Sequence, residues 1–140
     1  REAGGAAWCH FLGPVHDVER ISHLYRASDA LAIPGYVGLA VNRAFAHGMP
    51  VITVASALHS PEIDYVEDGV NGLILPASDG GLRAGLRGFA EDEALRRHLA
   101  QGALATRDKL DLGRMVAAFD DGVAAALART GGASLKARPA

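Results

Sequence analysis

The chain has 140 residues, of which 49% are hydrophobic and 21% charged, enough to form one domain with a buried core. Its net charge of −2, with Lys and Arg spread along the chain, excludes the basic surface typical of nucleic-acid-binding proteins. No apolar run approaches the about 20 residues of a membrane span, and the single cysteine, Cys9, excludes an internal disulfide and favours a reducing, cytoplasmic compartment.

The first two elements predicted are a strand and a helix. Trp8–Leu12 reads as a short buried strand, so we expect Cys9 within it to be buried and inert. Asp17 is placed to cap a helix over residues 18–27, and His16 with Asp17 suits a capped helix start better than an acid–base pair. The apolar positions on one face of this helix are Val18, Ile21, Leu24 and Tyr25.

A strand, a loop, a helix and a second strand follow. Ala30–Ile33 is predicted to be a strand that ends at a Pro-Gly step, and Leu39–His47 a helix that stops at Gly48. Val51–Val54 is continuously apolar, as expected of a parallel strand that is covered on both faces. The inward positions of the helix are Val41, Ala44 and Phe45.

The remaining chain is predicted to be one more strand and then helices. Ser60 reads as the N-cap of a short helix, and an Asn-Gly turn precedes a strand at Leu73–Leu75. Residues 131–140 are polar and rich in Gly and Ala, which predicts a disordered tail. Three helices are marked by Leu82, Leu86 and Phe89, by Leu95, Leu99 and Ala103, and by Met115, Phe119, Val123 and Leu127.

This order of elements predicts an α/β fold with a parallel Rossmann-like sheet, flanking helices and a helical C-terminus. Only four strands can be found and none precedes Trp8, so we expect residues 1–130 to be a partial domain within a longer protein, with further strands upstream. Ligands of such sheets bind outside the carboxyl ends of the strands. Pro34–Leu39 lies at such an end, where backbone N–H groups before a helix favour a phosphate.

Two sets of polar residues carry no chemistry that we can assign from the sequence. The cationic cluster of the helical region is diluted by acidic residues and reads as a solvated helix face. The six histidines have no ligand spacing, so we expect no metal site. The cluster comprises Arg83, Arg87, Arg96 and Arg97, and the histidines are His10, His16, His23, His47, His59 and His98.

Four blocks in order resemble a known family. FLGPV at 11–15, LYRASDALAIP at 24–34, GLAVNRAFAHGMPVIT at 38–53 and HSPEIDYVEDGVNGLILP at 59–76 are similar to the C-terminal half of retaining GT-B glycosyltransferases, the large class that includes sucrose- and mannose-transferring enzymes. The resemblance implies a domain that binds a nucleotide-sugar donor, no cofactor beyond that donor, and an acceptor-binding N-terminal domain upstream. It implies transfer of a sugar to a glycan or lipid-linked acceptor, in the cytoplasm or at the inner membrane face.

The resemblance also implies site residues. Backbone N–H groups of Tyr36, Val37, Gly38 and Leu39 would take the donor diphosphate, and the nucleotide base would rest near Pro14 and Val15. The two acidic residues that the family usually has, one for the donor sugar and one for the ribose, fall on Gly35 and Arg43. The chain thus resembles a subset with a PG-x-VGL loop. Arg43 cannot accept from ribose hydroxyls, but it can donate to them or pair with phosphate.

Other interpretations of these residues stay open. Gly35 and Gly38 are equally explained by a tight strand-to-helix turn, and Arg43 by a surface position on a helix. Glu62 suits an acid that complements a helix dipole better than a catalytic group, and His59 an ordinary loop histidine. At the level of function, a non-catalytic nucleotide-binding module is the alternative to a glycosyltransferase, and a sugar-nucleotide epimerase of the same fold ranks below both.

Overall fold

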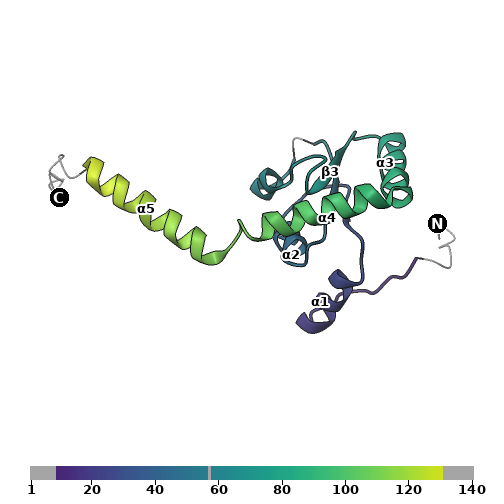
Figure 1. Cartoon of the computed structure of the whole chain (residues 1–140), viewed down its shortest axis with the longest axis horizontal. Helices are drawn as coiled ribbons and strands as arrows, with labels where there is room; N and C mark the ends of the chain where they lie inside the picture. The colour runs from purple at the N-terminus through teal and green to yellow at the C-terminus, as the bar shows by residue number, and fades with distance from the viewer. Residues whose placement is uncertain (1–8, 57, 131–140) are drawn as a thin grey trace, which may run out of the picture.

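The computed structural model describes residues 9–56 and 58–130, which form a small α/β body with a long C-terminal helix projecting from it (Figure 1). The three strands of the described chain are all parallel and neighbour one another in chain order. Ile33 pairs with Thr53 and Thr53 with Ile74, so the carboxyl ends of the strands lie side by side. The predicted α/β class with a parallel sheet is confirmed. The strands are β1 (Leu31–Ile33), β2 (Val51–Val54) and β3 (Gly72–Leu75).

The helices agree with the predicted ones within a few residues. Asp17 caps the first of them, since its Oδ1 accepts from the Arg20 amide at 2.6 Å, and Gly48 ends the second with a φ of 70°. The helices are α1 (Val18–Arg26), α2 (Ala40–Ala46), the 3₁₀ helix η1 (Pro61–Tyr65), α3 (Asp79–Glu91), α4 (Glu93–Arg107) and α5 (Leu112–Thr130).

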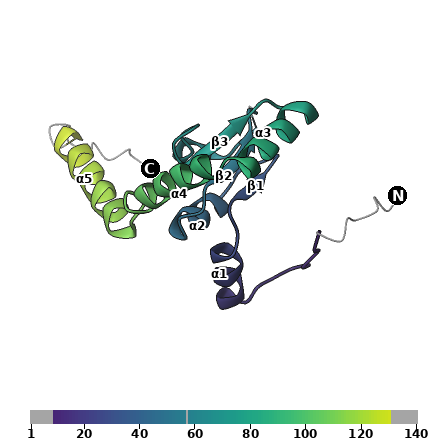
Figure 2. The ribbon, with the colours of Figure 1, turned by 45° about the vertical axis from the view of Figure 1, so that its right-hand side comes forward.

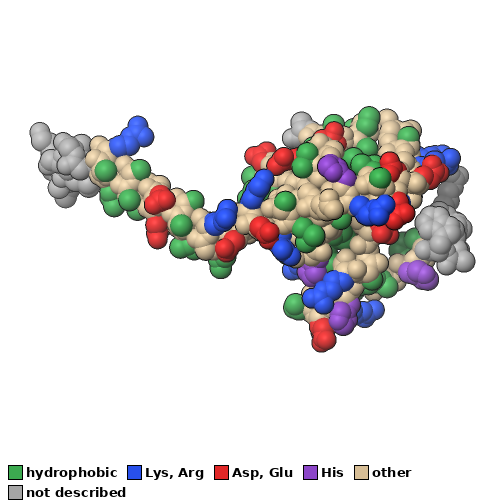
Figure 3. Space-filling view, in the orientation of Figure 1, with side chains coloured by type: hydrophobic (Ala, Val, Ile, Leu, Met, Phe, Trp, Pro, Cys, Tyr) green, Lys and Arg blue, Asp and Glu red, His purple; other side chains and the backbone are tan. Residues whose placement is uncertain are grey.

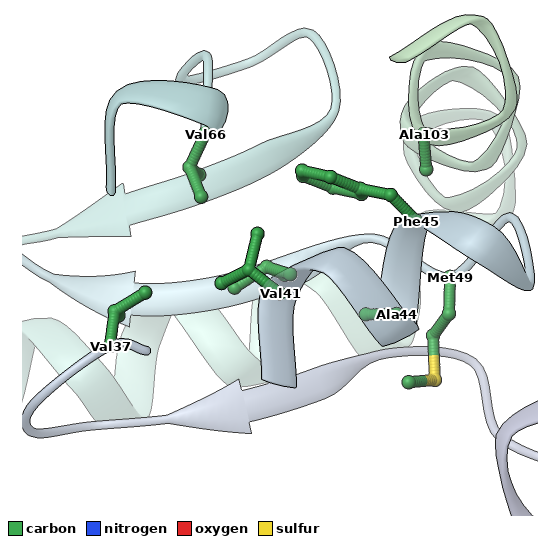
Figure 4. Close-up of a cluster of buried hydrophobic side chains, with 8 residues drawn as sticks. Val37, Val41, Ala44, Phe45, Met49, Val66 and Ala103 are labelled. Carbon is green, nitrogen blue, oxygen red and sulfur yellow. The ribbon is translucent and has the colours of Figure 1, made fainter. Parts of the chain in front are cut away.

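The core has two parts because every residue of β2 is buried and its side chains alternate between the faces of the sheet. Val51 joins the cluster formed with α2, in which Phe45 and Val37 are fully buried (Figure 4). Ile52 points the other way and packs with Phe89 of α3 and Leu99 of α4. The central strand therefore holds both layers of helices onto one sheet, and it fixes where its own carboxyl end and that of β1 emerge.

Two helices lie at the margins of this body. Figure 2 shows α1 hanging beside the sheet rather than lying on it, and Figure 3 shows hydrophobic side chains at the surface of α5. The predicted apolar face of α5 is largely exposed, with Phe119 71% and Met115 63% accessible. Among the helices that the structure describes, none is long and apolar enough to cross a bilayer.

One predicted element is wrong. Residues 9–12, the described part of the expected strand Trp8–Leu12, form no strand, and Phe11 is 91% exposed. Cys9 is exposed rather than buried. A strand requires a neighbour for its ladder, and within the described residues none pairs with this segment. The predicted tail, 131–140, lies outside the described residues.

Candidate functional site

The carboxyl ends of β1 and β2 carry two loops that meet. Residues 34–39 follow β1 and lead into α2, and residues 55–60 follow β2 and lead into η1. Because the two strands are parallel and paired, both loops leave the sheet at the same edge. A hollow of about 210 Å³ lies at this edge, with Pro34, Val54 and Asp79 among its lining residues. This is the part of an open α/β sheet in which ligands bind.

The first loop is held at a single residue, Val37. Its side chain is fully buried in the α2 cluster (Figure 4). Its N–H donates to Nδ1 of His59 at 3.2 Å, and its carbonyl accepts from the Ser60 amide at 3.1 Å and from the Ser60 hydroxyl at 2.6 Å. Side chain, N–H and C=O of Val37 are thus all fixed by neighbours, so the residues on either side of it stand out from a rigid point.

The amides beside Val37 face no acceptor of their own. Within the described residues, nothing accepts a hydrogen bond from the N–H groups of Tyr36, Gly38 or Leu39, whereas the Val37 amide is used by His59. The side chains of Tyr36 and Leu39 are 66% and 73% exposed. Three of the four amides predicted to hold a diphosphate therefore have no acceptor in the part of the chain that the structure describes, and the fourth, that of Val37, is bonded to His59.

The two loop glycines are not needed by the turn itself. Neither Gly35 nor Gly38 has the left-handed backbone that favours glycine. A Cβ at Gly35 would meet nothing within 4 Å, and one at Gly38 would meet only ordinary contacts, the nearest being 3.8 Å from Oγ of Ser60. Among the described residues, neither a left-handed backbone nor a close contact therefore requires glycine at these two positions.

Two residues of the second loop have roles that sequence reasoning missed. His59, interpreted as an ordinary loop histidine, bridges the two loops, because its Nε2 donates to the Val54 carbonyl at 2.8 Å while its Nδ1 accepts from Val37. Ser60 makes no N-capping bond, contrary to prediction, since its hydroxyl faces the Val37 carbonyl and the Glu62 carboxylate instead. The contacts of His59 and Ser60 with Val37 depend on the pairing of β1 with β2, which the sequence does not show.

Glu62 takes part in the same cluster. The hydroxyl of Ser60 lies within hydrogen-bond reach of its carboxylate, and this bond, with the carboxylate's own backbone amide, lowers the pKa of Glu62 against a small opposing effect of burial. One hydroxyl proton serves one acceptor at a time. The Val37 carbonyl also accepts from the Ser60 amide, so it keeps a hydrogen bond to Ser60 whichever of the two acceptors the hydroxyl donates to.

The remaining predicted site residues lie outside the loop, on α2 and in the segment before α1. Arg43 lines a cavity of about 130 Å³ on the side of α2 that faces α1, with Val18 and His47 among its neighbours. Pro14 is exposed and Val15 half-buried in the segment before α1. Within the described residues, no three His, Cys, Asp or Glu side chains are grouped so as to hold a metal ion.

Comparison with known proteins agrees with this architecture. The profile of the family described as glycosyl transferases group 1 matches residues 1–92. The chain belongs to this family, and its fold is that of the C-terminal Rossmann-like domain of GT-B glycosyltransferases. No match is found among curated proteins.

Three solved structures are similar to the chain. Sucrose-phosphate synthase from Thermosynechococcus elongatus shares 24% identity over 86% of this chain and 30% of its own, with a TM-score of 0.67. HepE (Alr3699) of Anabaena, solved with UDP, shares 22% over 73% and 29%, with a TM-score of 0.60. The C-terminal domain of the group 1 glycosyl transferase LpcC from Francisella tularensis shares 26% over 71% and 52%, with a TM-score of 0.58. The chain thus spans about half or less of each.

Proposed function

We propose that the chain is the donor-binding half of a retaining glycosyltransferase that uses a nucleotide sugar. The observation that carries the proposal is the loop between β1 and α2, where the amides of Tyr36, Gly38 and Leu39 find no acceptor among the described residues and where the turn requires neither Gly35 nor Gly38. Backbone N–H groups fixed at a strand end suit an anionic diphosphate. The UDP held by HepE, a protein of similar fold, supports a nucleoside diphosphate as the ligand class.

In the proposed reaction, the bond between the anomeric carbon of the sugar and the diphosphate oxygen breaks, and a bond from that carbon to an acceptor hydroxyl oxygen forms. The hydroxyl proton leaves with the nucleoside diphosphate, and the configuration of the sugar is retained. Negative charge grows on the departing diphosphate, and the amides of Tyr36, Gly38 and Leu39 stabilise that charge. An acceptor-binding domain completes the enzyme, which acts in the cytoplasm on a glycan or lipid-linked acceptor.

Within this proposal the finer assignments have unequal support. Gly35 offers open space next to the amides and suits the donor sugar. Arg43, as the ribose residue, and Pro14 and Val15, as the base platform, rest on the family's pattern, and Arg43 lines a cavity with residues of α1. The amides and Gly35 are therefore the residues to test first.

The activity is tested by assaying transfer with the complete protein and a panel of UDP-, GDP- and ADP-sugars, with calorimetry of the free nucleoside diphosphates in parallel. Transfer from at least one donor is the expected result. Binding of a nucleoside diphosphate with no turnover of any donor would overturn the enzyme and favour the alternative, a non-catalytic nucleotide-binding module, for which the absence of both usual acids at Gly35 and Arg43 speaks.

Gly35→Leu is expected to separate the two parts of the site. The new side chain has room in the fold and needs no left-handed backbone, so the free energy of unfolding should change by less than about 0.5 kcal/mol. In the donor slot, however, it should weaken binding of the intact nucleotide sugar by about tenfold or more, a loss of about 1.4 kcal/mol. Binding of the nucleoside diphosphate alone should change little.

Calorimetry of both ligands on Gly35→Leu checks this, with Gly88→Ala on the exposed surface of α3 as the control. Equal affinities of the variant and the wild-type chain for the nucleotide sugar would remove Gly35 from the donor slot.

A further inference from the structure

None of the predicted site residues lies in the loop that follows β2, yet this loop makes the hydrogen bonds that orient the loop after β1. His59 and Ser60 both bind Val37, and they bind opposite ends of it: His59 takes the N–H and Ser60 the C=O. Together these bonds fix the two peptide planes on either side of Val37. Since the peptide group is planar and trans, the Gly38 N–H must point away from Ser60, opposite to the Val37 carbonyl.

We propose that His59 is a positioning residue, which rests on the proposed function: by accepting from the Val37 amide it holds the loop so that the neighbouring amides meet a nucleoside diphosphate. The role requires one tautomer. The Val54 carbonyl can only accept, so Nε2 of His59 carries the proton and Nδ1 is the acceptor for Val37. His59 thereby links the loop to the carbonyl of Val54, at the end of the central strand, all of whose residues are buried.

Because Val37 is buried, its N–H depends on Nδ1 of His59 as a hydrogen-bond acceptor. The side chain of Val37 is fully buried, so its backbone cannot easily turn outward, and its N–H would lose its partner if Nδ1 were removed. Leaving such a donor unsatisfied is unfavourable, and the loop would be expected to rotate about Val37 to relieve it. A rotation there changes the direction of the Gly38 amide, which is a change in binding geometry rather than in the fold of the sheet.

Substitutions can separate the two bonds of His59. In Asn the side-chain oxygen can take the place of Nδ1 and accept from Val37, whereas in Gln the terminal NH₂ can take the place of Nε2 and donate to Val54. We expect His59→Asn to bind UDP, GDP or ADP within about threefold of the wild-type chain, and His59→Gln and His59→Ala about tenfold more weakly. His98→Asn is the matched control, because His98 also bonds a backbone carbonyl, that of Gly69 at 3.1 Å, but lies on α4.

The experiment is calorimetry of the three nucleoside diphosphates on the full chain, with thermal unfolding of every variant and NMR of the His59 ring nitrogens in the unliganded protein. Ring shifts of an Nε2–H tautomer and the order Asn above Gln and Ala support the proposal. An Nδ1–H tautomer, equal binding by all variants, or Asn binding as weakly as Gln would overturn it. If the wild-type chain binds no nucleoside diphosphate, the proposed function fails and the positioning role with it, even where the tautomer is the expected one.

Discussion

Gly102→Ala is expected to destabilise the protein more than any other change to a helical glycine. A Cβ at this position of α4 would lie 1.9 Å from the carbonyl oxygen of Val70 and 2.7 Å from its carbon, which are backbone atoms that no rotamer can move aside. Helix α4 crosses the turn before β3 at this point, so the clash would force the two apart. We expect a loss of about 3 kcal/mol or more in the free energy of unfolding, at or beyond the upper end for overpacked sites.

Gly88→Ala is the matched comparison for this prediction. Gly88 lies in α3, is exposed, and a Cβ there would meet nothing within 4 Å. Alanine is favoured over glycine inside a helix by about 0.5–1 kcal/mol, so this variant should be more stable than the wild-type chain. Chemical unfolding of both variants measures the difference. Similar stabilities of the two variants would contradict the close crossing of α4 and the Val70 turn.

Asn71→Asp is expected to have the second-largest effect. The Asn71 side chain is fully buried, its Oδ1 accepts from the Glu67 amide at 2.8 Å, and its Nδ2 donates to the Tyr65 carbonyl at 2.8 Å and to the Thr106 hydroxyl at 2.9 Å. Aspartate keeps the acceptor but turns the donor into a second oxygen that faces Tyr65 and Thr106. We expect the free energy of unfolding to fall by about 2–4 kcal/mol at neutral pH. The variant loses the two hydrogen bonds of Nδ2, buries a negative charge and places that charge against the Tyr65 carbonyl.

The pH dependence of this variant gives a further check. Burial raises the pKa of the introduced carboxyl above its unfolded value. The protonated form can donate again, so the deficit should be smallest at low pH and grow as pH rises through the pKa of the folded state. Thr106→Ser, which keeps the hydroxyl that accepts from Asn71, should cost less than Asn71→Asp. Equal unfolding midpoints for Asn71→Asp and the wild-type chain at neutral pH would contradict the network.

Much of the fold could be predicted from the sequence because local signals and burial agree there. Val51–Val54 is apolar except for Thr53 and is buried on both faces, and Asp17 and Gly48 mark helix ends with their own chemistry. The strand at Trp8–Leu12 was wrong because an apolar run indicates burial but does not provide the neighbouring strand that a ladder requires. Asn71 reads as half of a turn signal, while its partner on α4, Thr106, lies 35 residues away in the sequence.

The candidate site divides in the same way. The place of the loop between β1 and α2 could be predicted from the strand–Gly–helix pattern at Gly35–Leu39, since a strand end and a helix start are local features. The role of His59 could not, because it depends on the pairing of β1 with β2, which brings positions 22 residues apart into contact. The absence of a left-handed backbone at Gly38 likewise appears only in three dimensions, and the sequence alone could not decide whether the turn requires this glycine.

Binding of a diphosphate by the amides after β1 is tested by titrating the isotope-labelled chain with UDP, GDP and ADP and following its amide NMR spectrum. The amides of Tyr36, Gly38 and Leu39 are expected to shift most, because they lack acceptors within the described chain, and that of Val37 less, because His59 already holds it. Shifts centred elsewhere, or no response of these amides to any of the three nucleotides, would show that this loop does not bind the diphosphate.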